Sequence, residues 1–268
     1  MGDRVVVMPQ FPCGVCDLCL TGEYIHCENV LDVSEYLGSD SGRATMAQYM
    51  VKQDWLLVPI PDGVSDEHAS MACCGLGPTF GAMERMTVDS HDTILIAGLG
   101  PVGLGGVING VSRGARVIGV DSNPYRAGLA RELGAVAVVD PSDDRVLEQI
   151  HELTRGRGVD KALDCTGVPD GQLLVLNSVR RKGQAAMIGE GGDLTINVAA
   201  HLLRKGLVLH GIWHYNLSLT PRMMRMIERL GPQLDRLITH AFPMERVEEA
   251  WRLQLSGQCG KVLLKPWE

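Results

Sequence analysis

The sequence predicts a doubly wound α/β domain attached to a smaller, β-rich part. Short, continuous apolar runs alternate with helical segments from about residue 76 to 216, as expected for a parallel sheet covered on both faces. A glycine-rich turn at 98–103 follows the first of these runs. The chain has 268 residues, enough for one large domain or two ordinary ones.

Six apolar runs are the predicted strands of the sheet, at 93–97, 116–120, 136–139, 161–164, 184–188 and 207–211. The helices between them have recognisable ends. Asn123 can cap a helix that begins at Pro124 and ends at Gly134, and an aspartate at 143 or 144 can start the next one. Six strands with crossover helices predict the doubly wound topology.

The flanking segments, 1–75 and 217–268, are predicted to form the second unit, which leaves 76–216 as the central domain. Residues 1–75 have the pattern of irregular β structure, with apolar pieces at 5–8, 47–51 and 56–59. The tail contains an amphipathic segment at 244–255 and a closing strand at 261–264. Because the tail is too short for a domain of its own, we expect it to pack on the first segment.

Composition restricts the possible partners. Hydrophobic residues make up 45% of the chain and charged residues 21%, which supports an aliphatic core and excludes a disordered chain. The net charge of −7, with both signs interspersed, disfavours nucleic-acid binding. The longest apolar run, 94–108, is too short to span a bilayer. Together with the clustered cysteines, this predicts a protein of the reducing cytoplasm with no membrane partner.

The turn Gly98-Leu99-Gly100-Pro101-Val102-Gly103 has the spacing G-x-G-x-x-G between a predicted strand and a predicted helix. This context favours a Rossmann-type dinucleotide site. The first glycine permits the tight turn, the second lets the backbone approach a pyrophosphate, and the third allows the helix to pack closely on the strand. The helix N-terminus then presents free N–H groups to the phosphates.

An acidic residue, Asp121, ends the second predicted strand. It would accept hydrogen bonds from the ribose hydroxyls and repel a 2′-phosphate, which favours NAD over NADP. Arg126 can help to hold the ribose. The alternative is a glycine-rich turn whose aspartate only caps the helix that starts at Asn123.

Cys13, Cys16, Cys19 and Cys27 are spaced to close around one ion. Four thiolates leave no open coordination position, so a zinc here would be structural. The alternative is an iron–sulfur cluster, but that pattern has its fourth cysteine earlier and a proline after it. His26 is expected to be a neighbour of the site and not a ligand.

The remaining cysteines and histidines give weaker signals. Cys73 and Cys74 are adjacent, so at most one is expected to be functional, while Cys165 and Cys259 are expected in the core. No histidine stands out as a ligand. His210 and His214 are four residues apart, but that spacing begins in a predicted strand, where it does not bring the rings together.

The order of these motifs closely resembles the zinc-dependent medium-chain alcohol dehydrogenases. Beyond the four-cysteine lobe and the glycine loop, the similar motifs are Gly2-Asp3-Arg4-Val5, Ala47-Gln48-Tyr49, Ile60-Pro61-Asp62 and Gly260-Lys261-Val262. The resemblance covers nearly the whole chain. It implies that the β-rich part is a GroES-like domain, incomplete at its N-terminal side, that carries the structural zinc lobe at 13–27.

The resemblance also implies an activity: NAD-linked oxidation of a secondary alcohol, polyol or amino-alcohol, or reduction of the carbonyl, with a catalytic zinc as Lewis acid. Cys74 matches the third catalytic-zinc ligand of the family. Pro101 and Val102 belong to the cofactor loop. Thr166, Ile188 and Lys261 match further cofactor contacts.

Two departures from the family accompany the resemblance. The sequence begins at the Gly2-Asp3-Arg4-Val5 strand, whereas the family's other catalytic-zinc ligands and its proton relay precede that strand. We therefore expect a truncated reading frame, and a catalytically silent NAD- and zinc-binding chain is the alternative function. Pro78 stands near a position where the family usually has threonine beside the nicotinamide.

Association with further copies is also expected. The run 207–213 is the last predicted strand of the sheet, and a flat apolar edge favours pairing with a second copy. The resembling family forms dimers and tetramers in this way, so we expect a homodimer or homotetramer. The expected small-molecule partner is an alcohol or carbonyl substrate.

Overall fold

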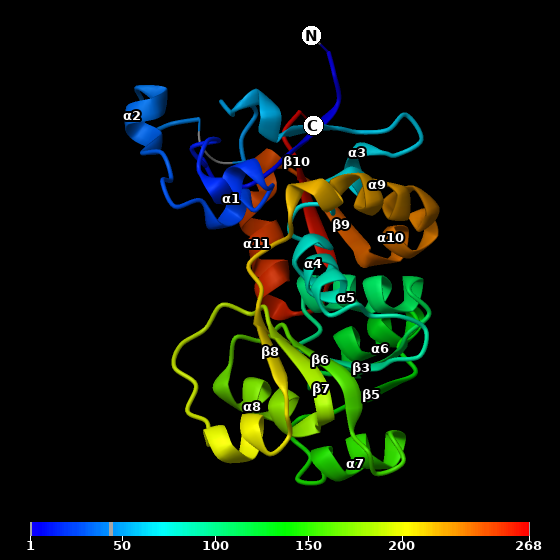
Figure 1. Cartoon of the computed structure of the whole chain (residues 1–268). Coiled ribbons are helices and arrows are strands. Elements are labelled where there is room, and N and C mark those ends of the chain that lie inside the picture. The colour runs from blue at the N-terminus through cyan, green and yellow to red at the C-terminus, as the bar shows by residue number, and fades with distance from the viewer. Residues whose placement is uncertain (1, 43–44, 268) are drawn as a thin grey trace.

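The computed structural model describes residues 2–42 and 45–267 and contains a sheet of six parallel strands (Figure 1). The strands are β3 (Thr93–Ala97), β4 (Arg116–Val120), β5 (Ala137–Val139), β6 (Val159–Asp164), β7 (Val179–Met187) and β8 (Val208–Gly211). Their order across the sheet is β5-β4-β3-β6-β7-β8. The chain thus starts near the middle, runs to one edge, and returns to build the other half, which confirms the doubly wound topology.

Helices cover both faces of this sheet. They are α5 (Pro101–Ser112), α6 (Pro124–Glu132), α7 (Val146–Leu153), α8 (Pro169–Ser178) and the short η3 (Ala199–Leu203). Along β3, Ile94 and Ile96 join one buried cluster, whereas Leu95 and Ala97 join another that includes Val175 of α8. Since both faces of the strand are buried, its sequence has to be apolar throughout.

The predicted helix ends are confirmed at α6 and shifted at α7. The Asn123 side chain accepts the N–H groups of Tyr125 and Arg126, and Gly134 has a φ of +107° just after α6. The Asp143 carboxylate instead accepts the Arg145 N–H at 2.8 Å. It therefore stabilises the turn before the helix, and α7 begins three residues later than the aspartate.

The N-terminal part contains short elements around two antiparallel strands, β1 (Val5–Val7) and β2 (Leu57–Pro59). The helical pieces are α1 (Asp17–Leu20), η1 (Tyr24–His26), α2 (Val33–Leu37), η2 (Asp54–Leu56) and α3 (Asp66–Ser70), and the next helix, α4 (Gly77–Arg85), precedes β3. The predicted apolar piece at 47–51 is not a strand. Tyr49 and Val51 are exposed there, so their apolar side chains do not form the buried face of a sheet.

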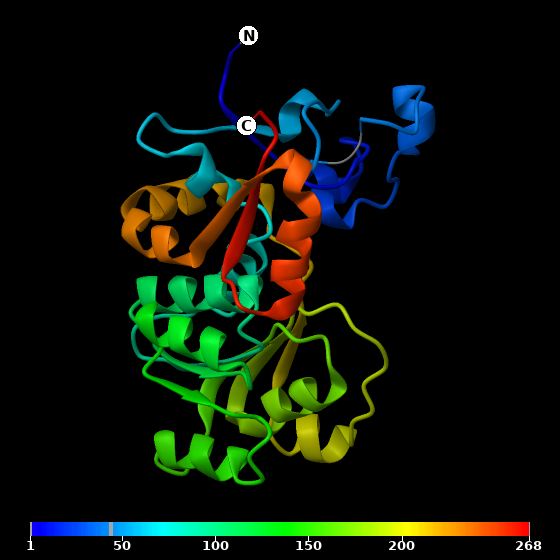
Figure 2. The same cartoon turned by 180° about the vertical axis from the view of Figure 1, so that it is seen from behind.

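The C-terminal part consists of η4 (Leu217–Leu219), α9 (Thr220–Arg229), α10 (Gly231–Leu237), β9 (Ile238–Pro243), η5 (Met244–Arg246), α11 (Val247–Ser256) and β10 (Lys261–Lys265). β9 and β10 pair in parallel, and Figure 2 shows α11 beside them. The tail returns to the first segment as expected. Gln48 Nε2 donates to the Pro266 carbonyl at 2.8 Å, and the Tyr49 and Trp267 rings lie 5.2 Å apart.

One buried cluster connects the N-terminal segment to the domain that contains the six-stranded sheet. It extends from Met8 of the first segment and Tyr24 of η1, through Leu76, to Ile94 of β3. We propose the boundaries predicted above, with 76–216 as one domain and 1–75 plus 217–268 as the other. Among the helices of the described residues, none has the length and apolar composition needed to cross a bilayer.

Candidate functional site: the glycine loop, the adjoining cleft and the cysteine lobe

The glycine loop connects β3 to α5 in the conformation that the motif requires. Gly98 has a φ of +83°, and its N–H donates to the Val120 carbonyl at 2.9 Å. A Cβ at Gly98 would lie 2.7 Å from Cγ2 of Thr166, on the loop that follows β6. Pro101 is the first residue of α5 and therefore needs no N–H partner there.

The other two glycines of the motif have different surroundings. A Cβ at Gly103 would lie 1.8 Å from the Gly98 carbonyl oxygen, so only glycine allows this approach of helix and loop. A Cβ at Gly100 would meet nothing within 4 Å. The space beside Gly100, at the N-terminus of α5, is therefore open to a ligand. Free N–H groups and open space at a helix N-terminus suit the pyrophosphate of a dinucleotide.

Asp121 stabilises this loop from the end of β4. Its Oδ2 accepts the Leu99 N–H at 2.7 Å, and its Oδ1 accepts the Asn123 N–H at 2.8 Å. The Asn123 side chain, and not Asp121, caps α6. Arg126 lies nearby, and its buried Nε has no hydrogen-bond partner among the described residues. The structure thus places the Asp121 carboxylate at the glycine loop.

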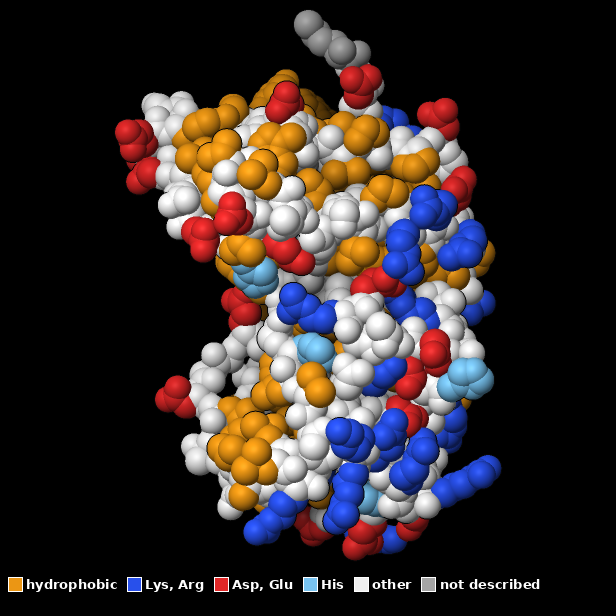
Figure 3. All heavy atoms as spheres, viewed as in Figure 1, with side chains coloured by type: hydrophobic (Ala, Val, Ile, Leu, Met, Phe, Trp, Pro, Cys, Tyr) orange, Lys and Arg blue, Asp and Glu red, His pale blue; other side chains and the backbone are white. Residues whose placement is uncertain are grey.

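A cleft of about 410 Å³ adjoins the glycine loop. It brings together Val102, Thr166 and Ile188, which the sequence assigned to the cofactor, and Cys74, which it assigned to a catalytic zinc. The other lining residues are Pro9, Gln10, Ile25, Cys73, Pro78, Cys165, Gly189, Glu190, Ile212, Trp213 and His214. Asp121, Arg126 and Lys261 are not part of this lining. Figure 3 shows the surface hollowed between the upper part of the molecule and the part that holds the sheet.

A buried carboxylate shapes one wall of the cleft. Asp164, at the end of β6, is fully buried and accepts the N–H groups of Thr166 at 3.0 Å and Gly167 at 3.2 Å. The Thr166 hydroxyl donates to the same carboxylate. Pro78 lines the cleft, whereas the next residue, Thr79, is fully buried and donates to the Leu76 carbonyl. Thr79 is therefore not part of the cleft lining, and its hydroxyl does not replace the one that is absent at Pro78.

His214, which the sequence pattern does not single out, lies in the back wall of the cleft. Its Nε2 is 3.8 Å from the Cys73 sulfur, and its Nδ1 is 3.4 Å from the Tyr24 hydroxyl. Burial lowers the pKa of His214 to about 4. Burial also raises the pKa of Cys73 to about 12, while the positive charges of Lys261 and Lys52 act in the opposite direction. Both the imidazole and the thiol are therefore neutral at neutral pH.

One sequence signal for His214 was available. It follows β8, and ligand sites of open α/β sheets lie beyond the carboxyl ends of the strands. Cys74 is the exposed member of the Cys73–Cys74 pair, so it is the thiol accessible from the cleft. In 2–42 and 45–267, no two further His, Cys, Asp or Glu side chains join Cys74 in a compact ligand set. These residues therefore do not by themselves form the three-ligand site that a catalytic zinc needs.

The four clustered cysteines do converge. The sulfur atoms of Cys13, Cys16, Cys19 and Cys27 all lie within 4.8 Å of one another, and those of Cys16 and Cys27 are 4.0 Å apart. Zinc–sulfur bonds of about 2.3 Å in a tetrahedron place the sulfurs about 3.8 Å apart, so the set fits a single zinc ion. His26 is exposed, and its ring lies near Trp213, 6.3 Å between centroids.

Backbone groups prepare the lobe for a cation. Hydrogen bonds from the backbone at Cys19 and Glu28 lower the pKa of Cys16 to about 6, whereas burial raises that of Cys19 to about 12. The Cys13 N–H donates to the Cys27 sulfur at 3.2 Å. Backbone hydrogen bonds from Val15 and Cys16 also lower the pKa of Cys13, so the lobe favours negative charge and a cation would stabilise it further.

Comparisons with known proteins identify the family to which the chain is similar. The family model described as alcohol dehydrogenase GroES-like domain matches residues 1–62, and the one described as zinc-binding dehydrogenase matches residues 101–229. The chain is 34% identical over 267 residues to the zinc-type alcohol dehydrogenase-like protein YphC of Escherichia coli, with 98% of this chain and 74% of that protein covered.

Two further similarities concern an enzyme sequence and a solved structure. Over 276 residues the chain is 30% identical to L-threonine 3-dehydrogenase of Symbiobacterium thermophilum, with 99% of this chain and 75% of that protein covered. The crystal structure of 2R,3R-butanediol dehydrogenase from Bacillus subtilis superposes with a TM-score of 0.85 at 26% identity. That superposition covers 99% of this chain and 74% of the other.

Proposed function

Because the chain belongs to the zinc-dependent medium-chain alcohol dehydrogenase family, we propose that it interconverts an alcohol and its carbonyl with NAD. The observation that carries the proposal is the cleft, whose lining joins the loop residue Val102 to Thr166 and Ile188 of the sheet edge and to Cys74. A cofactor lying along the glycine loop would end in this cleft, where the substrate would meet it.

The proposed substrate is a secondary alcohol, a polyol or an amino-alcohol. Among the similar proteins, one is named for threonine and another for butanediol, and both compounds carry a secondary hydroxyl beside a second polar group. The cleft suits a small molecule of this kind because its lining includes both apolar side chains, such as Ile25 and Ile188, and polar ones, such as Gln10 and Glu190.

Each part of NAD has a proposed set of contacting residues. The loop N–H groups beside Gly100 would bind the pyrophosphate, and Asp121 with Arg126 would receive the adenosine ribose. Thr166 and Ile188 would position the nicotinamide end, and Lys261 would contribute its positive charge near Cys73. Bound NAD supplies the hydride acceptor.

The two zinc sites differ in how well the chain supports them. Cys13, Cys16, Cys19 and Cys27 would hold a structural zinc that fixes the lobe, η1 included. Cys74 is proposed as one ligand of a catalytic zinc. The described residues do not complete that site.

Metal analysis combined with an NAD-linked alcohol panel tests the proposal. Two zinc ions per chain and turnover of a secondary alcohol would support the enzyme. One zinc per chain, NAD affinity and no turnover would instead support the alternative, a silent NAD- and zinc-binding chain. Absence of NAD binding would contradict both.

We also propose a homodimer or homotetramer that works in the cytoplasm. β8 is an edge strand on which Val208 is 49% and Leu209 40% exposed. Figure 3 shows hydrophobic side chains gathered over the region of η3 and β8. The eight cysteines are all unpaired, which supports a reducing compartment.

A further inference from the structure

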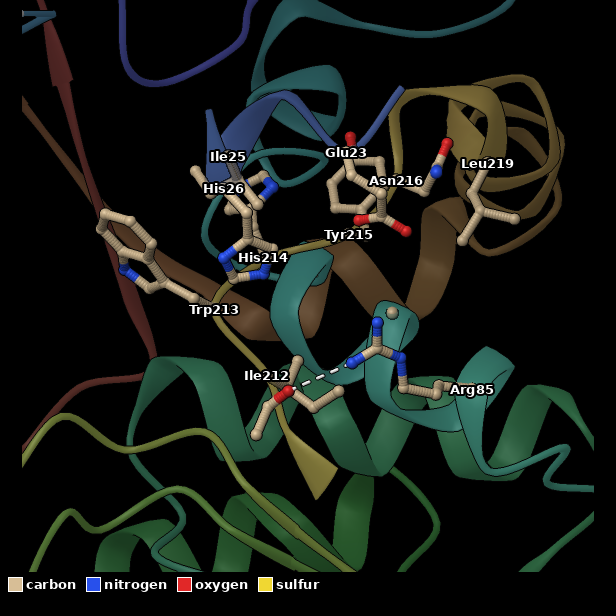
Figure 4. A pocket seen from close by; sticks show the side chains of 12 residues that line it. Glu23, Ile25, His26, Arg85, Ile212, Trp213, His214, Tyr215, Asn216 and Leu219 are labelled. Atoms are coloured by element: carbon tan, nitrogen blue, oxygen red, sulfur yellow. Dashed lines mark hydrogen bonds between the residues drawn. The ribbon is translucent and has the colours of Figure 1, made fainter. Parts of the chain in front are cut away.

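A second cavity, of about 200 Å³, lies behind the segment that follows β8 (Figure 4). Ile25, Ile212, Trp213 and His214 line both this cavity and the cofactor cleft, so the two share a wall. A water molecule occupies about 30 Å³ of the liquid. The second cavity therefore has room for one molecule of roughly amino-acid size. We call it the rear cavity.

Two opposite charges line the rear cavity without neutralising each other. Arg85 ends α4, and its Nη1 donates to the Gly211 carbonyl at 3.3 Å. Glu23 precedes η1, and its carboxylate forms no hydrogen bond or ion pair with any residue that the structure describes. In Figure 4 the two side chains approach from opposite sides, and their charged ends point toward one another across the cavity.

The rest of the wall is mixed, with polar His26, His214 and Asn216 beside apolar side chains. Ile25 and Leu219 line it, together with the buried Tyr215. An aliphatic group could be removed from water against these side chains while a charged group at each end of the ligand met a charge of opposite sign. A guanidinium binds a carboxylate through two parallel hydrogen bonds, which suits Arg85 to a carboxylate.

We propose that the rear cavity binds a small zwitterion of the α-amino acid class. The ligand carboxylate meets Arg85, its ammonium group meets Glu23, and its aliphatic side chain packs on Ile25 and Leu219. This site shares a wall with the cofactor cleft, and it does not depend on the proposed function.

L-Valine is a suitable probe because it has no hydroxyl group for a dehydrogenase to oxidise. Isovalerate is valine without the amino group, and isobutylamine is valine without the carboxylate. Titration of the full chain by calorimetry should show saturable binding of valine, at least tenfold tighter than that of either analogue. No saturable valine binding, or equal binding of all three compounds, would overturn the proposal.

Two variants place the ligand in the rear cavity. Glu23→Gln should weaken valine binding at least tenfold and leave isovalerate binding unchanged, whereas Arg85→Gln should weaken both. Arg225→Gln, on α9 outside the cavity, is the matched control and should bind valine like the wild type. Circular dichroism verifies that each variant is folded. If folded Glu23→Gln and Arg85→Gln bind valine as the wild type does, the proposal is wrong.

Discussion

The imidazole Nε2 of His214 lies 3.8 Å from the sulfur of Cys73. This contact joins the segment after β8 to the segment before α4, and the Tyr24 hydroxyl on the other ring nitrogen adds η1. The ring also stacks on Tyr215, with centroids 4.8 Å apart. One buried side chain therefore joins its own segment to two others that are distant in sequence, and the three together form the back wall of the cleft.

Protonation of His214 should destabilise the fold. Burial lowers its pKa from 6.5 to about 4, so the unfolded chain binds the extra proton more readily than the folded chain does. This contribution to stability is complete above about pH 6.5 and is lost as the pH falls toward 4, by about 3 kcal/mol in total. Urea unfolding at pH values across this window measures the slope.

Two variants separate the titration from the hydrogen bond. His214→Gln should lower stability at neutral pH and flatten the pH dependence, since glutamine does not titrate. Tyr24→Phe removes only the hydroxyl and should retain the slope, at a cost of about 1 kcal/mol. If His214→Gln has the same pH dependence as the wild type, the histidine is not the group responsible.

Alanine at two glycines of the loop should have opposite consequences. Gly103→Ala places a Cβ 1.8 Å from the Gly98 carbonyl oxygen, so we expect a loss of about 3 kcal/mol or more in stability. Gly100→Ala meets no atom within 4 Å and has an ordinary φ of −64°, so stability should change little. NADH affinity should nevertheless fall at least tenfold, because the methyl group enters the space assigned to the pyrophosphate.

Thermal unfolding and NADH fluorescence titration measure these two effects separately. Gly100→Ala is the control for the stability loss of Gly103→Ala, and Gly103→Ala is the control for the affinity loss of Gly100→Ala. Unchanged NADH affinity in folded Gly100→Ala would contradict the proposed position of the pyrophosphate.

Asp121→Asn should alter cofactor preference. The amide retains an oxygen for one of the two N–H groups now accepted by the carboxylate, from Leu99 and Asn123, so the loop should remain folded. It no longer repels a 2′-phosphate, so the ratio of NADPH to NADH affinity should rise about tenfold or more. Fluorescence titration with both cofactors measures the ratio. An unchanged ratio would leave Asp121 with a purely structural role in the loop.

Cys19→Ser should release the structural zinc. It removes one of four converging sulfurs, and we expect at least a hundredfold lower zinc affinity together with protease cleavage within residues 13–27. Cys259→Ala, a buried cysteine outside the lobe, is the control and should keep its zinc. Mass spectrometry of the native protein counts the metal. Iron in place of zinc would favour the cluster alternative and contradict the assignment.

The features that the sequence predicted correctly depend on local requirements. Gly98 must adopt a positive φ, and Gly103 must allow a close approach, so the motif itself specifies the loop. The strands of the large sheet were predictable because both faces are buried and the apolar runs are continuous. The piece at 47–51 is also apolar, but Tyr49 packs on Trp267, and the segment pairs with no strand among the residues that the structure describes.

The features that were missed depend on distant contacts. His214 is informative only next to Cys73 and Tyr24, which are 141 and 190 residues away in sequence. The rear cavity likewise joins Glu23 of the lobe to Arg85 of α4, and no spacing along the chain indicates that pair. Packing of the lobe against the segment after β8 creates both features.

Charges on β8 should dissociate the proposed oligomer. Within the described residues β8 pairs only with β7, and its exposed Val208 and Leu209 offer an apolar edge to a second copy. Leu209→Lys should convert the oligomer to a monomer at micromolar concentration without unfolding the sheet, because the side chain is already 40% exposed. Light scattering coupled to size exclusion measures the mass.

A lysine at the opposite side of the sheet provides the control for that experiment. Val136 is 55% exposed and directly precedes β5, the other edge strand. Val136→Lys adds the same charge to an edge that we do not assign to the interface, so its mass should equal that of the wild type. A wild-type monomer at micromolar concentration would contradict the oligomer, and dissociation by Val136→Lys instead of Leu209→Lys would assign the interface to the β5 edge.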